Sequence, residues 1–146
     1  MPLTREEQLA YAAGLFDGEG CIEANETTLR VKLAMSDMEG IQLLVQLFGG
    51  GLHSSRPGPS QTGKRRRIIH VWYINGRDAA GCLAALLPYL RVKARQAQLG
   101  LLFELGKPHT TDEGGPVVRP NELRRRAAIV TLLKQAKREK DYVDEE

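Results

Sequence analysis

Apolar residues recur along this chain in two rhythms, one of two residues and one of three to four. The period of two is clearest between residues 28 and 35, where apolar positions alternate with Thr, Arg, Lys and Ala. Such alternation is typical of a strand that buries one face and leaves the other in solvent. The apolar positions are Leu29, Val31, Leu33 and Met35, and the opposite face carries Arg30 and Lys32.

Capping residues, glycines and prolines divide the rest of the chain into further elements. Thr4 can cap a first helix, a capping-box pattern at residues 36–39 opens a second, and the glycines at 49–51 end it. A loop rich in Pro, Gly and Ser at 57–63 separates two later strands. The predicted helices are 4–16, 36–49, 79–87, 90–105 and 121–140, and the predicted strands are 21–25, 28–35, 52–56 and 66–74.

Apolar spacing also predicts which sides of the last two helices face the core. For the helix at 90–105 these positions are Leu90, Ala94, Ala97, Leu101 and Leu105. For the helix at 121–140 they are Leu123, Ala127, Val130 and Leu133.

The order of the elements predicts an α+β fold in which a helix followed by a hairpin occurs twice. Two hairpins give one four-stranded antiparallel sheet, with helices on one face and an open polar surface on the other. We expect a single domain over residues 1–146, with its core at about 4–107, a loop at 107–120 and a C-terminal helix at 121–140.

The first predicted helix carries a stripe of small residues. Ala10, Gly14 and Gly18 are spaced by four and therefore line one helical face. Each glycine lowers helix propensity by up to about 1 kcal/mol, a cost that favours close approach of another backbone along the stripe. Glu19 follows the stripe, where a second glycine ends the helix.

Residues 12–20, with the sequence A-A-G-L-F-D-G-E-G, resemble the LAGLIDADG motif of homing endonucleases. The carboxylate, the glycines and the apolar positions fall in register, and the element order agrees with the family's α-β-β-α-β-β-α core over about residues 4–107. The resemblance implies the LAGLIDADG homing-endonuclease fold, whose motif helix forms the interface between two subunits or two halves. With one motif only, this chain is expected to act as a homodimer. The expected interface residues are Ala10, Ala13, Gly14, Asp17 and Gly18.

The resemblance also implies a metal site and a catalytic lysine. Glu19 occupies the eighth motif position, which carries the family's acidic metal ligand, and Gly18 lies beside it. Lys93 resembles the lysine that the family keeps at the start of its last core helix, close to the active site. The implied cofactor is Mg²⁺ or Mn²⁺; since Mg²⁺ takes only one or two protein carboxylates, a sparse acidic site suffices. Asp17 is better suited to fix the helix end or its partner than to bind metal.

One position departs from the family pattern. Many relatives carry Gln or Asn at the end of the second strand, where the amide positions water near the metal, whereas this chain has Met35-Ser36-Asp37. Met35 cannot position water, and Ser36 or Asp37 is expected to cap the next helix. Either another residue performs that role or catalysis is impaired.

The distribution of charge indicates a polyanionic partner. The net charge is +3, but residues 1–26 carry a surplus of five carboxylates and residues 27–107 a surplus of eight cations. Double-stranded DNA is the expected partner, bound by the open sheet face and its loops. On the fourth strand two faces remain possible, His70 with Trp72 or Val71 with Tyr73. The candidate DNA-binding residues are Glu23, Asn25, Arg30, Lys32, Arg56, Lys64, Arg65, Arg66, Arg67, His70, Arg91 and Arg95.

These features predict a homodimeric, site-specific endonuclease that makes a double-strand break at a long palindromic or nearly palindromic site. The resemblance implies that such cleavage promotes the spread of an intron or intein. Two alternatives remain: a maturase that binds intron RNA, and a DNA-binding protein without catalysis.

The sequence predicts an intracellular, cytoplasmic protein without a membrane partner, because it shows no export signal and no long apolar run. Cys21 and Cys82 are expected to be buried thiols.

Overall fold

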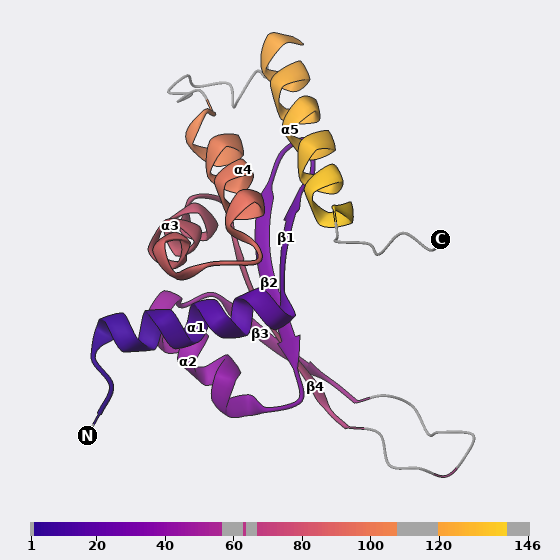
Figure 1. Cartoon of the computed structure of the whole chain (residues 1–146). Coiled ribbons are helices and arrows are strands. Elements are labelled where there is room, and N and C mark those ends of the chain that lie inside the picture. Colours follow the sequence, from indigo (N-terminus) through magenta and orange to yellow (C-terminus); the bar gives the residue numbers. More distant parts are fainter. Residues whose placement is uncertain (1, 57–62, 64–66, 108–119, 140–146) are drawn as a thin grey trace, which may run out of the picture.

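The computed structural model describes residues 2–56, 63, 67–107 and 120–139. It is an α+β structure in which helices cover one face of an antiparallel sheet, and the sheet order is β1-β2-β4-β3 (Figure 1). The elements are α1 (Arg5–Glu19), β1 (Gly20–Ala24), β2 (Leu29–Met35), α2 (Met38–Phe48), β3 (Gly51–Ser55), β4 (Ile69–Asn75), α3 (Gly76–Leu86), the short 3-10 helix η1 (Leu87–Tyr89), α4 (Ala94–Leu105) and α5 (Pro120–Arg138).

The fold predicted from the order of elements is therefore confirmed. The first helix begins with a capping box, in which the Thr4 hydroxyl accepts from the Glu7 backbone and the Glu7 carboxylate accepts from the Thr4 backbone. The predicted box at residues 36–39 does not form. Asp37 is the N-cap of α2, and its side chain makes no capping hydrogen bond.

The core lies between the sheet and the helices. Alternate residues of β2 are buried, as the period of two predicts, and α1 contributes its own buried stripe. The largest fully buried side chains are Trp72, Phe16, Phe103, Ile22, Leu29, Leu33, Ile41, Leu44, Leu83 and Leu86.

Apolar spacing predicts the buried faces of the last two helices only in part. Leu90 and Ala97 are buried as predicted, but Leu105 is 73% exposed, and α4 also buries Gly100 and Phe103. On α5, Leu133 is buried as predicted, but Leu123 and Ala127 are exposed. The other buried residues of α5 are Arg126 and Ile129.

A charged network explains the orientation of α5. The Arg126 guanidinium donates from Nε to Glu122 at 2.9 Å and from Nη1 to the Glu26 carbonyl, in the β1–β2 turn, at 3.0 Å. Arg125 donates to both oxygens of Glu122 and to the carbonyls of Leu102 and Phe103 at the end of α4. Because a buried arginine needs such partners, these bonds turn the Arg126 side of α5 inward. The network anchors α5 to α4 and to the hairpin.

Among the described helices, none has the length and apolar character needed to cross a membrane.

Candidate functional site

Glu19 lies at the junction where α1 ends and β1 begins. The next residue, Gly20, has extended backbone and donates its N–H to the Phe16 carbonyl. A Cβ atom at Gly20 would overlap the Phe16 ring, so this sharp change from helix to strand requires a glycine. The Glu19 side chain is exposed, and no described residue forms a hydrogen bond or ion pair with it.

Asp17 joins α1 to the segment that precedes α4. Its carboxylate accepts from the backbone N–H groups of Arg91 at 2.9 Å, Val92 at 3.1 Å and Lys93 at 2.9 Å. Its side chain thus fixes a distant part of its own chain, so the predicted contact of Asp17 with a second subunit is not supported. These bonds hold the start of α4 against the end of α1.

Lys93 is brought to Glu19's end of α1 by the same contact. It is the N-cap residue of α4, and its Nζ donates to the Asp17 carbonyl oxygen at 2.6 Å. An ammonium has three donors, so two remain for other groups. The structure therefore brings Lys93 to the last turn of α1, which also carries Glu19.

The small-residue stripe of α1 faces outward. Ala10, Gly14 and Gly18 are exposed, and a Cβ atom at either glycine would meet no atom within 4 Å. Ala13 is different because it is fully buried in the core beside Ala12. The predicted role of Ala13 at the interface is therefore wrong; three of the five predicted interface residues remain available to a partner.

The donor set for a metal is sparse. The described residues contain no group of three or more His, Cys, Asp or Glu side chains that could hold a metal ion. Among the described residues, the candidate site offers the exposed Glu19 carboxylate and, beside it, the backbone of Gly18. This set fits Mg²⁺, which keeps several waters and binds few protein carboxylates, and it does not fit a metal that needs a closed protein cage.

The open face of the sheet is basic and internally bonded. Lys32 Nζ lies 2.8 Å from a Glu23 carboxylate oxygen, and the hydrogen bond from Lys32 is the main reason that the pKa of Glu23 is lowered. Arg30 donates to Asn75 Oδ1 at 3.0 Å and its guanidinium carbon lies 5.7 Å from the centre of the Tyr73 ring. These contacts fix the positions of the Arg30 and Lys32 side chains on the open face of the sheet.

The register of β4 decides which of its faces is open. Lys32 pairs with Tyr73, so Tyr73 shares the open face, whereas Trp72 is fully buried. His70 lies on the same side as Trp72, and its Nδ1 is 2.6 Å from the Ser54 hydroxyl. The predicted DNA contact of His70 is therefore on the wrong face.

The open face also carries Asn75, which the sequence did not single out as a DNA contact. Tyr73, one of the two alternatives for this strand, and His53 on β3, a weaker candidate in the sequence, lie on the same face. A groove of about 470 Å³ runs over this part of the sheet and is lined by Arg30, Lys32, His53, Val71 and Tyr73. The alternation along β4 predicts that one face of this strand is open. It does not predict which face, because both carry aromatic residues.

The remaining predicted contacts lie around the sheet. Asn25 closes the β1–β2 turn, where its Oδ1 accepts from the backbone of Thr27 and Thr28. Arg56, Arg67, Arg91 and Arg95 are exposed. Lys64, Arg65 and Arg66 lie outside the described residues.

Met35 ends β2 on the helix side of the sheet, and a Cβ atom at Gly40 in α2 would lie 2.8 Å from its sulfur.

The two cysteines differ in burial. Cys82 is buried as expected, which raises the pKa of its thiol to about 12. Cys21 is only half-buried, since it lies on the open face paired with Lys32.

The fold is similar to that of the homing endonuclease I-CvuI in two crystal structures. In complex with its target Sro1.3 in the presence of calcium, that protein matches with a TM-score of 0.65 and 21% identity, over 95% of this chain and 87% of that chain. In complex with an I-CreI target in the presence of magnesium, with the DNA not cleaved, it matches with a TM-score of 0.64 and 23% identity, over 93% of this chain and 85% of that chain. No protein-family model and no curated protein matches the chain. The chain therefore has the homing-endonuclease fold that its LAGLIDADG-like motif predicts.

Proposed function

We propose that this protein is a homodimeric, site-specific DNA endonuclease that depends on a divalent metal. The observation that carries the proposal is the exposed Glu19 at the end of α1, which has no hydrogen-bond or ion-pair partner among the described residues. It lies in the same turn as Asp17, to which Lys93 is bonded, and directly before the edge strand of a basic open sheet. The fold supports it further, since the similar protein I-CvuI is a homing endonuclease in complex with its DNA target.

In this proposal the residues divide the work of phosphodiester hydrolysis. Glu19 would hold Mg²⁺ or Mn²⁺, which supplies charge neutralisation at the phosphate and an acidified water. Lys93 directs its free N–H groups at a phosphate oxygen and stabilises the charge that develops there. Asp17 positions Lys93 through the three backbone bonds to residues 91–93. Arg30 and Lys32 hold the DNA on the sheet.

Two copies are needed for a double-strand break, because each chain offers one Glu19. The exposed stripe Ala10, Gly14 and Gly18 is the surface on which the two α1 helices would pack. A twofold dimer implies a palindromic or nearly palindromic target. The resemblance to LAGLIDADG proteins supports a role for this cleavage in the homing of an intron or intein.

The test is cleavage of a randomised duplex library with Mg²⁺ by the wild type and by Glu19→Gln. We expect the wild type to cut a palindromic site and Glu19→Gln to bind the same site without cutting it. Glu6→Gln, which neutralises an exposed carboxylate at the other end of α1, is the matched control and should cut like the wild type. Equal cleavage by wild type and Glu19→Gln would remove Glu19 from the mechanism.

A second candidate function rests on Met35, which offers no polar group for positioning water. If the wild type binds but never cuts, a DNA-binding role or a maturase role on intron RNA takes precedence. Competition between duplex DNA and structured intron RNA separates these two, since a maturase would prefer the RNA.

A further inference from the structure

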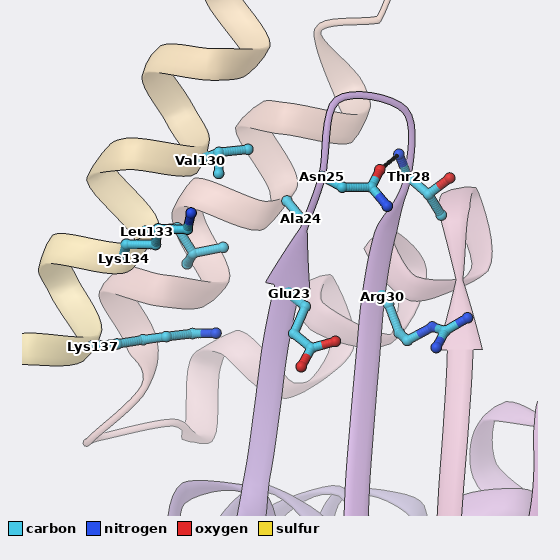
Figure 2. A pocket seen from close by; sticks show the side chains of 9 residues that line it. All are labelled: Glu23, Ala24, Asn25, Thr28, Arg30, Val130, Leu133, Lys134 and Lys137. Atoms are coloured by element: carbon cyan, nitrogen blue, oxygen red, sulfur yellow. Dashed lines mark hydrogen bonds between the residues drawn. The ribbon is translucent and has the colours of Figure 1, made fainter.

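The C-terminal helix reaches over the edge of the sheet toward its open face. Lys137 Nζ lies 3.8 Å from the sulfur of Cys21, which belongs to the open side of β1. Figure 2 shows the Lys137 side chain extending from α5 toward Glu23 on the neighbouring strand. The positive charge of Lys137 also contributes to the lowered pKa of Glu23. α5 thus brings a cation to the face that the proposed function assigns to DNA.

Two grooves meet at Lys137. The first, of about 540 Å³, lies between α5 and the β1–β2 hairpin and includes Glu23, Arg30, Lys134 and Lys137 (Figure 2). The second, of about 290 Å³, continues to the candidate nuclease site and includes Gly20, Lys93, Lys137 and Glu139. Lys137 therefore stands between the sheet surface and the junction that carries Glu19.

The charges of these grooves favour an anion. The first holds three cations and one carboxylate, and that carboxylate already pairs with Lys32. Within the part of the chain that the structure describes, neither Lys134 nor Lys137 has a carboxylate partner. Their spacing of three residues places both on one side of α5. The Glu122–Arg125–Arg126 network anchors that helix, so the two ammonium groups are held over the groove.

We infer that Lys134 and Lys137 bind backbone phosphates of the DNA, with Lys137 on the phosphate next to those at the nuclease site. The inference rests on the proposed function and extends it to α5. This helix lies outside residues 4–107, the part of the chain that resembles the LAGLIDADG core. A phosphate contact carries no sequence information, so α5 adds affinity and alignment on the DNA, and the sheet reads the bases.

The test is the salt dependence of binding to a mixed-sequence DNA duplex, which needs no knowledge of the target. Each lost phosphate contact lowers the slope of log K against log salt by about one, so Lys137→Gln should lower it by about one for each bound subunit. Lys137→Arg keeps the charge and should retain the slope. Arg138→Gln removes the adjacent charge, which lines neither groove, and should also retain it. Thermal unfolding of the variants checks that they fold alike.

The outcomes separate the inference from the proposed function. A wild type with no salt-dependent affinity for the duplex would remove the proposed function itself. A wild type that binds, with the same slope in Lys137→Gln and Arg138→Gln, would overturn the role of α5 and leave the nuclease proposal standing. A slope that is lower in Lys137→Gln, and unchanged in Lys137→Arg and Arg138→Gln, supports the inference.

Discussion

Among single residues, Asp17 has the widest influence on the candidate site. Its carboxylate organises three successive backbone N–H groups, and its carbonyl holds the ammonium of Lys93. The sequence indicated a structural role for Asp17 because it precedes the glycine of the motif. It could not name the partners, since these are 74 to 76 residues away and no local pattern links the two segments.

We expect Asp17→Ala to lower both stability and cleavage. Three N–H groups would lose a charged acceptor, and a hydrogen bond to a charged group contributes about 1.5–3 kcal/mol, so a total loss of a few kcal/mol is expected. Cleavage should fall further than binding, because Lys93 loses its fixed position.

Urea unfolding and single-turnover cleavage measure these two effects. Glu6→Ala, on the same helix but far from residues 91–93, is the control and should change neither. Unchanged stability in Asp17→Ala would mean that water replaces the carboxylate at no cost.

At the scale of elements, the sequence predicted the order and approximate bounds of the helices and strands better than the faces they bury. Alternation with a period of two predicted both β2 and its buried face correctly, because one side of that strand is uniformly apolar. It could not orient β4, where aromatic residues occupy both sides. It also misjudged α5, because burial of Arg126 depends on Glu122 and on the Glu26 carbonyl, which is 100 residues away.

The anchoring network of α5 should make stability depend on pH in the acid range. Hydrogen bonds from Arg125, together with those from Arg126, lower the pKa of Glu122 from 4.5 to about 2. A carboxyl group with a lowered pKa stabilises the fold above its ordinary value and loses that contribution as pH falls toward the folded value. Glu122 therefore contributes fully above about pH 5, and the contribution disappears as the pH approaches 2.

Urea unfolding at a series of pH values tests this expectation with Glu122→Gln. The variant should be less stable than the wild type at neutral pH, and the difference should shrink as the pH falls from about 5 to 2. Glu39→Gln removes one exposed carboxylate from the first turn of α2 and controls for the change in net charge. A constant difference across this range would show that Glu122 acts by packing alone.

At the scale of the whole molecule, the distribution of charge and the fold both favour a polyanionic partner. The basic middle of the sequence supplies Arg30 and Lys32 of the open sheet face, and the acidic beginning includes the helix that carries Glu19. Composition could predict the polyanionic partner. It could not predict the contribution of α5, because the charges of residues 108–146 balance and only the packing of α5 brings Lys134 and Lys137 beside the sheet.

Assembly into a dimer is testable at Gly14. A leucine there meets open space within one chain, so the monomer should keep its fold and gain up to about 1 kcal/mol of helix propensity. The same side chain would block close packing of two α1 helices. We therefore expect Gly14→Leu to sediment as a monomer and to lose double-strand cleavage.

Gly81→Leu is the matched control. Gly81 is an exposed glycine on α3 where an added Cβ also meets nothing within 4 Å, so this variant has the same gain in propensity away from the stripe. It should sediment like the wild type. A dimer in Gly14→Leu would exclude the stripe as the interface.

The hydrogen bonds between Asp17 and residues 91–93 also determine when the candidate site can assemble during synthesis of the chain. Glu19 is synthesised early, but Lys93 reaches the last turn of α1 through a contact with Asp17 that spans 76 residues. A ribosome must therefore translate through η1 and the start of α4 before the two groups can meet. Under the proposed function, a nascent chain that carries the complete motif still lacks the lysine of the candidate site, which assembles once the start of α4 has docked against the end of α1.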